Sequence, residues 1–249
     1  MRKKEIALII CIAIVVIAGP LYIFLTDKKP AATRAPQASK STQQTQQLPP
    51  AIATFDKNKY SHDDVTSIWV VVNKARPLNP KDYAPNDLVS VGGGQQMRKE
   101  AAGALTALIA AAKKEGLTIS PLSGYRSYTT QVSVYGAEVK NYGQAQADSE
   151  SARPGTSEHQ TGLAVDVGGG GCGIDDCFGN TAEGKWLAAN AYKYGFIIRY
   201  TADKQAITGY KAEPWHIRYI GTDLSKEMDR QEVTTLEEFF DLPAAPNYL

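Results

Sequence analysis

The hydrophobic and polar positions divide the chain into three stretches. Residues 6–25 form an apolar run without a charged side chain. Residues 27–53 are rich in Gln, Ser, Thr, Ala and Pro and show no apolar period; they cannot bury enough surface to fold, and we predict a disordered or extended linker. From residue 54 onward, apolar positions recur at the spacings of helices and strands. The pattern therefore predicts one folded domain over 54–249.

The apolar run has about 20 residues, which is the length that spans a hydrocarbon core. Basic residues at 2–4 precede it, and it ends in IFLTDKK without the small-residue pattern of a cleavage site. We therefore predict an uncleaved signal anchor, a transmembrane helix over 1–26, with a cleaved secretory signal as the alternative. Lys28 and Lys29 follow the run, so the positive-inside bias is modest. With an N-terminal anchor, we expect the folded domain outside the cytoplasm.

Helical and strand patterns both occur within the folded region. Apolar spacing and closing glycines predict three main helices, at 97–116, 128–143 and 182–195. Short apolar runs predict strands, at 117–124, 163–169, 196–200 and 216–220. A short polar helix and TTLEEFF complete the C-terminal part, whereas 68–89 contains three prolines, lacks a period and predicts an irregular path over the surface. Together these elements predict an α+β fold with a small, mainly antiparallel sheet flanked by helices.

Charge and cysteine content narrow the function classes. The formal net charge is +1, and no basic stripe with interleaved aromatics occurs, so we predict no nucleic-acid partner. Cys172 and Cys177 flank four residues in a glycine-rich loop, which is not the spacing of C-x-x-C zinc or redox motifs. We expect a small disulfide loop in an oxidising compartment, with two free thiols as the alternative.

The stretch TSEHQTGLAVDV contains His159, one of three histidines in the chain, and Asp166 inside an apolar run. A helix would separate the two residues by about 10 Å along its axis. Metal ligands lie at about 2 Å from a shared ion, so the two side chains can meet only if the chain turns between them. Thr161-Gly162 is where we expect that turn.

A second charged segment, EPWH, brings Glu213 and His216 to the start of a predicted strand. Two imidazoles and one carboxylate suit zinc and leave a fourth position for water, whose pKa zinc lowers toward about 7. Glu213 is then the free carboxylate that can take the proton of that water. Other divalent ions are also compatible with this ligand set, and no H-E-x-x-H helix occurs in the sequence.

A third segment, SGYRSYTTQ, presents Arg126 from a turn at Gly124. Arginine offers a planar fork for a carboxylate or a positive charge for a developing oxyanion, and both suit hydrolysis of a peptide near its C-terminus. Each residue alone also has an ordinary structural explanation. A histidine can be a core or surface residue, Asp166 a cap or ion-pair partner, and Arg126 a surface residue. We interpret Trp215 as core packing and His62 as an exposed turn residue.

Together the three segments resemble a known family. Ser157, His159, Gly162, Ala164 and Asp166 form S-x-H-x(2)-G-x-A-x-D, and E-x-W-H follows at 213–216. With SGYRS and PGTSEHQTGLAVDV, this resembles the zinc D-alanyl-D-alanine peptidases, in detail the VanY-type D,D-carboxypeptidases, over nearly all of residues 60–242. The resemblance implies a fold shared with lysostaphin-type enzymes and hedgehog signalling domains.

The resemblance also implies roles for individual residues. His159, Asp166 and His216 bind zinc (Zn2+) and Glu213 is the general base, while Arg126 stabilises the transition state or holds the substrate carbonyl. Two further residues, Gln131 and Ser157, fall where the family contacts substrate.

The implied enzyme removes the terminal D-Ala from peptidoglycan stem peptides, or lipid-linked precursors, that end in D-Ala-D-Ala. The predicted anchor would place it on the cell-wall side of the membrane. Two alternatives stay open. One is a peptidoglycan endopeptidase of the same superfamily. The other is a non-catalytic, zinc-containing module that binds the cell wall. Such a module would not need a general base at Glu213.

Overall fold

A four-stranded antiparallel sheet with strand order β3-β4-β6-β5 lies at the centre of the computed structural model, which describes residues 54–249. Its strands are β3 (Ser120–Ser123), β4 (Ala164–Gly168), β5 (Phe196–Ile198) and β6 (His216–Tyr219). Every residue of the two middle strands, β4 and β6, is buried. This explains why β4 is a nearly continuous apolar run and not an alternating one.

A two-stranded hairpin, β1 (Leu88–Gly92) and β2 (Gln95–Arg98), precedes the first helix. Its turn uses Gly93 and Gly94 with positive φ, as tight hairpin turns require. The sequence pattern does not predict this hairpin, because the second strand, QQMR, has no apolar alternation. The predicted irregular path over 68–89 is therefore wrong in its last two residues.

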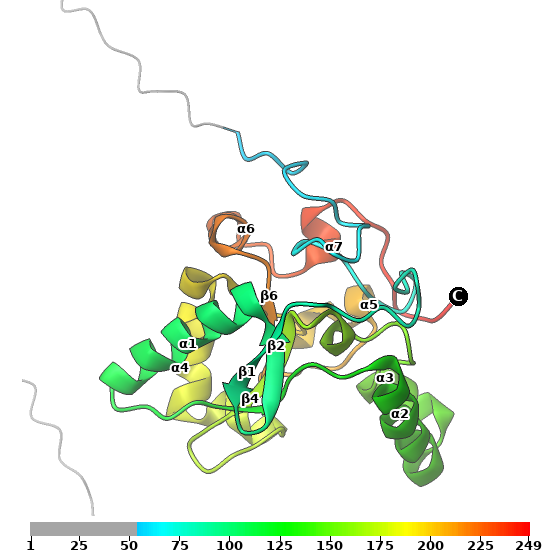
Figure 1. Ribbon diagram of the computed structural model, residues 1–249, viewed down its shortest axis with the longest axis horizontal. Helices are drawn as coiled ribbons and strands as arrows, with labels where there is room; N and C mark the ends of the chain where they lie inside the picture. The colour runs from blue at the N-terminus through cyan, green and yellow to red at the C-terminus, as the bar shows by residue number, and fades with distance from the viewer. Residues whose placement is uncertain (1–53) are drawn as a thin grey trace, which may run out of the picture. The chain divides into compact units, whose positions relative to one another are not determined.

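Helices surround the sheet, with α1 and α4 on one side and the α2–α3 pair apart from them (Figure 1). The α-helices are α1 (Lys99–Lys114), α2 (Tyr128–Tyr142), α3 (Gln144–Glu150), α4 (Ala182–Asn190), α5 (Gln205–Thr208), α6 (Thr222–Arg230) and α7 (Leu236–Phe239). The 3-10 helices are η1 (Glu158–Thr161), η2 (Asp176–Asn180), η3 (Ala191–Tyr194) and η4 (Ala202–Lys204). The α+β architecture with a small antiparallel sheet agrees with the prediction.

Two apolar clusters stabilise this arrangement. The larger one joins the sheet to α1, whose Ala101, Leu105, Leu108 and Ala112 recur at helical spacing and are fully buried. The smaller one packs Trp69 against α6 and α7. The expectation that 68–89 follows the surface is therefore wrong for residues 69–72, which are buried. The apolar residues show no strand or helix period, because consecutive side chains are all buried. The indole Nε1 of Trp69 also donates a hydrogen bond to Ile220 O at 2.9 Å.

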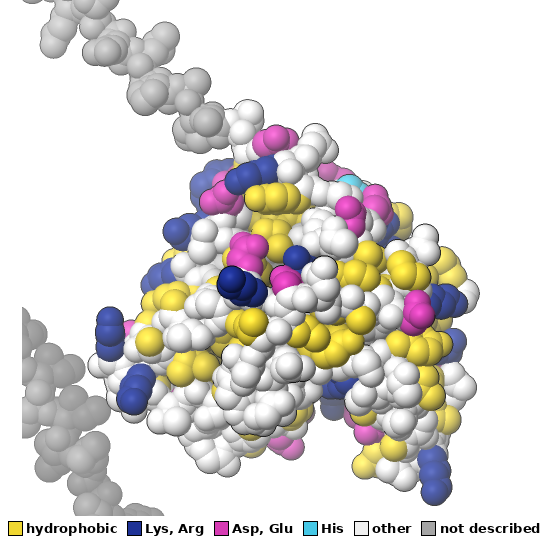
Figure 2. Space-filling view, in the orientation of Figure 1, with side chains coloured by type: hydrophobic (Ala, Val, Ile, Leu, Met, Phe, Trp, Pro, Cys, Tyr) yellow, Lys and Arg dark blue, Asp and Glu magenta, His cyan; other side chains and the backbone are white. Residues whose placement is uncertain are grey.

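The predicted helix over 182–195 changes character near its end: α4 stops at Asn190 and continues as the 3-10 helix η3. Helix α3 is not predicted, because QAQADSE has no apolar stripe. Basic and acidic side chains are interspersed on the face shown in Figure 2. None of the helices within 54–249 combines the length and apolar character needed to cross a membrane. The predicted anchor over 1–26 and linker over 27–53 lie outside the described residues.

Candidate active site

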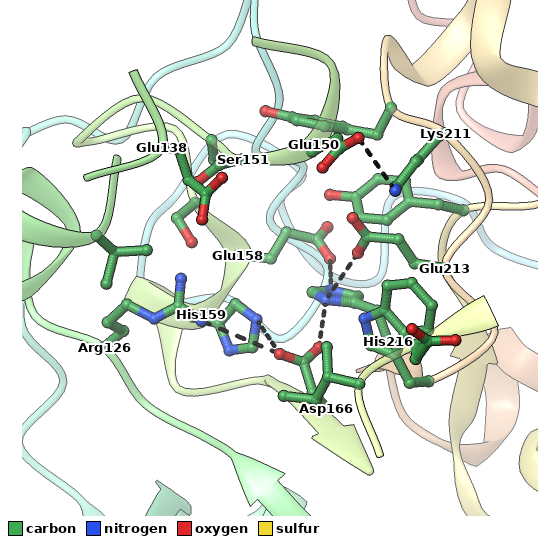
Figure 3. A pocket seen from close by; sticks show the side chains of 18 of the residues that line it. Arg126, Glu138, Glu150, Ser151, Glu158, His159, Asp166, Lys211, Glu213 and His216 are labelled. Carbon is green, nitrogen blue, oxygen red and sulfur yellow. Dashed lines mark hydrogen bonds and ion pairs between the residues drawn. The ribbon is translucent and has the colours of Figure 1, made fainter. Parts of the chain in front are cut away.

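The strands of the central sheet bring two of the predicted ligands together. Asp166 on β4 is the register partner of His216, the first residue of β6. His216 Nδ1 lies 3.0 Å from Asp166 Oδ1, and His159 Nε2 lies 3.3 Å from Asp166 Oδ2. All three side chains are buried, and their ligand atoms lie within 4.8 Å of one another. Figure 3 shows the two imidazoles on either side of the Asp166 carboxylate.

The turn between His159 and Asp166 lies where the sequence predicts it. His159 belongs to η1, which ends at Gly162 with φ 69°. A Cβ at Gly162 would lie 3.0 Å from Arg98 Cγ and 3.1 Å from Leu88 Cδ2. Because the backbone is left-handed and the neighbouring side chains are close, this position favours glycine. The turn folds η1 back over the start of β4 and brings the imidazole to the carboxylate.

Hydrogen bonds behind the two imidazoles show that the three residues fit a zinc ion. His159 Nδ1 lies 2.8 Å from Gly124 O, and a carbonyl only accepts, so Nδ1 carries the proton and Nε2 faces Asp166. His216 Nε2 lies 3.4 Å from Glu158 Oε2, so Nδ1 faces Asp166. Metal-binding histidines are held in this way, by an outer carbonyl or carboxylate. Two such imidazoles and one carboxylate are a zinc-binding set.

Glu213 lies at the edge of this centre, in the turn that precedes β6. Its Oε2 is 3.7 Å from His216 Nδ1, and the residue is buried. Burial raises the pKa of the Glu213 carboxyl to about 7, although His216 and Arg126 act in the opposite direction. A carboxyl with a pKa near neutrality can both take and return a proton, as a general acid–base group must.

Arg126 approaches the centre from the opposite side, where its Nη2 lies 4.0 Å from Asp166 Oδ2. The same Nη2 donates to Ser123 Oγ at 2.9 Å, and Nη1 donates to Gln131 Oε1 at 2.8 Å. Gln131 is fully buried, and its own Nε2 donates to Ala152 O at 2.7 Å. Gln131 thus helps to orient Arg126, and its contact with substrate, which the resemblance implies, stays a prediction.

A cavity of about 480 Å³ opens over the centre and contains both His159 and Glu213 in its walls. Ser157, for which the resemblance implies contact with substrate, also lines it. The loop at 172–177 contributes Ile174 and two aspartates to one wall, and the structure joins Cys172 to Cys177 in a disulfide. Trp215 is packed in the larger apolar cluster and borders the same cavity.

The sequence motifs indicate no role for Glu158, although it lies between Ser157 and His159. Its side chain is fully buried and contacts Arg199 and Arg218 as well as His216. Burial alone would raise the pKa of this carboxyl, but the two guanidinium groups hold it well below its usual range. A glutamate beside a histidine gives no such signal in sequence, because its arginine partners are about 40 to 60 positions away.

Comparisons with known proteins agree on one family. The family model described as "VanY: D-alanyl-D-alanine carboxypeptidase" matches residues 94–222. The chain is 45% identical over 186 residues to the putative carboxypeptidase YodJ of Bacillus subtilis (strain 168), covering 70% of this chain and 67% of that protein.

Two solved structures are similar over most of the described residues. The LdcB LD-carboxypeptidase is 44% identical, with a TM-score of 0.66 over 71% of this chain and 87% of that one. A mutant of the vancomycin-resistance D,D-pentapeptidase VanY, in complex with Zn(II), is 33% identical, with a TM-score of 0.62 over 70% and 98% of the respective chains.

Proposed function

The chain belongs to the VanY family of D-alanyl-D-alanine carboxypeptidases and is a zinc-dependent peptidoglycan carboxypeptidase, and on this premise we propose that it removes the terminal D-Ala from stem peptides on the outer side of the cell membrane. One observation carries the proposal. The zinc-binding residues His159, Asp166 and His216 share a cavity with a buried carboxyl, Glu213, and a clamped cation, Arg126.

The residues divide the chemistry between them. A zinc ion with three protein ligands lowers the pKa of a water molecule and polarises a carbonyl oxygen. Glu213 is close enough to the centre to accept the proton of the attacking water and then deliver it to the leaving amine. Hydrogen bonds to Ser123 and Gln131 hold the guanidinium group of Arg126 beside the metal centre. There its positive charge stabilises the negative charge that develops on the attacked carbonyl oxygen. Ser157 contributes a hydroxyl at the cavity wall.

Two reactions fit this site. The first is the D,D-carboxypeptidase reaction, which splits D-Ala-D-Ala, as the sequence motifs and the description of the family model indicate. The second is the L,D-carboxypeptidase reaction, in which the residue before the terminal D-Ala has the L configuration. Sequence identity favours the L,D-carboxypeptidase reaction, because the chain is 44% identical to the LdcB LD-carboxypeptidase and 33% identical to the VanY D,D-pentapeptidase.

Two other functions have less support. An endopeptidase of the same superfamily would use the same centre, but the matching family and relatives are named as carboxypeptidases. A non-catalytic wall-binding module would have no use for a buried carboxyl beside the metal ligands, where Glu213 lies.

The proposed position of the folded domain, on the outer side of the cell membrane, rests on the predicted anchor over 1–26 and linker over 27–53. The linker would let the folded domain reach stem peptides of nascent wall or of a lipid-linked precursor. Treating intact protoplasts of cells that express the full chain with an external protease tests this part. Digestion of the folded domain supports an outward-facing anchor, and a domain that is protected until lysis contradicts it.

Cleavage products decide between the two reactions. The purified full chain is incubated with a stem pentapeptide ending in D-Ala-D-Ala and, separately, with the tetrapeptide that ends in a single D-Ala. Mass spectrometry then shows which peptide loses one alanine. Loss from the pentapeptide alone supports the D,D reaction, and loss from the tetrapeptide alone supports the L,D reaction. Release of a dipeptide or an internal cut contradicts the carboxypeptidase proposal.

A further inference from the structure

A buried ion-pair network lies directly behind the metal centre, and Glu158 is the member that touches it. Glu158 Oε1 accepts from Arg199 Nε and from Arg218 Nη1, each at 2.8 Å. Its other oxygen, Oε2, lies 3.4 Å from His216 Nε2. Both carboxylate oxygens therefore have partners, and only one of these partners belongs to the metal centre.

This arrangement excludes the two roles that a carboxylate beside a zinc site usually has. The Glu158 side chain has no exposed surface, in contrast to Glu213, whose side chain is 11% exposed. It lies on the side of His216 opposite the atom that faces Asp166, because it contacts Nε2 and Asp166 contacts Nδ1. Glu158 borders the cavity, but its side chain has no exposed surface and both of its oxygens are already paired, so it is placed neither to bind the metal nor to exchange protons with substrate.

We infer that Glu158 is a positioning residue of the zinc centre, which accepts the Nε2–H of His216 and thereby turns the Nδ1 lone pair toward the metal. The two histidines are then used through different atoms. His159 donates Nδ1–H to Gly124 O and offers Nε2, whereas His216 donates Nε2–H and offers Nδ1. The tautomer of each ring follows from the group behind it.

The network keeps Glu158 available as an acceptor. Arg199 also donates to both oxygens of Glu237 on α7, at 2.9 and 2.7 Å, and all of these side chains are fully buried. Arg218 donates through Nη2 to Val70 O at 2.7 Å. Two carboxylates therefore face two guanidinium groups, so the charge of Glu158 is balanced without removing the proton from His216. Through Arg199, helix α7 joins the network, but Glu237 itself does not contact Glu158 or His216 in the pairs that form it.

The inference deepens the proposed function at its zinc site only, and it does not depend on which peptide bond is cut. Its tests therefore measure metal binding and the tautomer of His216, and not cleavage. A failure of these tests leaves the carboxypeptidase proposal standing, and a failure to cleave any stem peptide leaves the inference standing.

The first test compares Glu158→Gln with Glu237→Gln in the full chain. An amide at 158 keeps the shape, but its one oxygen is held by two arginine donors, so its NH2 group faces His216 Nε2 and favours the wrong tautomer. We expect zinc affinity, measured by competition with a chelating dye, to fall about 10- to 100-fold, as for other outer partners of metal-binding histidines. Glu237→Gln disturbs the same network one step further away and should change zinc affinity less than about threefold.

Denaturant unfolding of both metal-free variants separates positioning from simple loss of stability. The inference holds if Glu158→Gln loses zinc affinity and Glu237→Gln, although destabilised, does not. It is overturned if Glu158→Gln binds zinc like the wild type, or if both variants lose the same affinity.

The second test needs no variant in the network and applies even where Glu158→Gln fails to fold. The chain contains three histidines, so nitrogen-15 spectra of the imidazole rings in the zinc-loaded full chain are simple, and His62→Gln assigns the third ring. We expect one bound histidine with a protonated Nε2 and the other with a protonated Nδ1. Two rings that both bind through Nε2 would overturn the inference.

Discussion

Asp166 and His216 lie directly opposite each other on the antiparallel strands β4 and β6, and their side chains meet at 3.0 Å. The register of this strand pair places the carboxylate between two imidazoles, since η1 delivers His159 from the other side. A shift of one residue would turn Asp166 to the opposite face of the sheet. The sheet register therefore determines whether the metal centre forms.

Asp166→Asn tests the contribution of the carboxylate to metal binding. The amide keeps the size of the side chain but removes the charge that balances a divalent cation between His159 and His216. We expect zinc affinity to fall by more than about 100-fold, because a direct ligand matters more than an outer partner. Zinc content after dialysis against a weak chelator measures this, and a variant that retains full zinc and full activity contradicts it.

Arg126→Lys tests the charge-stabilising role. Lysine keeps the positive charge but has one nitrogen in place of the planar fork that bonds Gln131 through Nη1 and Ser123 through Nη2. We expect kcat to fall by about 100-fold, in the range for loss of one oxyanion donor. Steady-state kinetics with a stem peptide measure the effect, and unchanged zinc content serves as the control. A change in KM alone would assign Arg126 to substrate binding.

Gly162→Ala tests the turn between His159 and Asp166. The left-handed backbone strains any residue with a Cβ, and its neighbours at 3.0 and 3.1 Å would have to shift, so we expect a loss of about 1–3 kcal/mol in the free energy of unfolding. Gly136→Ala in α2 is the matched control, because a Cβ there meets nothing within 4 Å, and we expect it to gain about 0.5–1 kcal/mol. Denaturant unfolding compares the two, and equal stabilities would contradict the account of the turn.

The buried network predicts how stability depends on pH. Burial raises the pKa of Glu237, but Arg199 outweighs it and holds the pKa below the ordinary value of 4.5. A carboxyl with a lowered folded-state pKa stabilises the fold above pH 4.5, and this contribution is lost as the pH falls through the folded-state pKa.

Glu237→Gln should therefore unfold more easily at neutral pH and lose less further stability in acid than the wild type. Denaturant unfolding between about pH 7 and about pH 3 measures both slopes. Parallel curves for the two proteins would show that Glu237 does not contribute to the acid dependence.

Residue chemistry makes much of this site predictable from sequence. Histidine and aspartate types, together with a Thr-Gly turn, indicate a metal centre before any contact is known, and Glu213 and Arg126 follow from the segments beside it. The roles of Glu158 and Gln131 are not predictable in the same way. Each depends on buried partners from distant segments, such as Arg218 for Glu158 and Ala152 for Gln131.

The elements of the fold likewise separate into those that the sequence predicts and those that it does not. Helices with an apolar stripe, such as α1, and buried apolar strands, such as β4, are predicted at nearly their observed positions. The β1–β2 hairpin and α3 are not, because their sequences carry no clear period and tertiary packing decides their conformation. Burial of Trp69 and Val71 likewise depends on α6 and α7, which come more than 140 positions later.

The central claim is that zinc held by His159, Asp166 and His216 works with Glu213 to release a terminal D-Ala. The most direct measurement is D-Ala release by the wild type and by Glu213→Gln, with zinc content determined on the same samples. We expect Glu213→Gln to keep its zinc and to lose about 100- to 10,000-fold in rate, and we expect a chelator to abolish release by the wild type. Release at the wild-type rate by zinc-loaded Glu213→Gln would contradict the central claim.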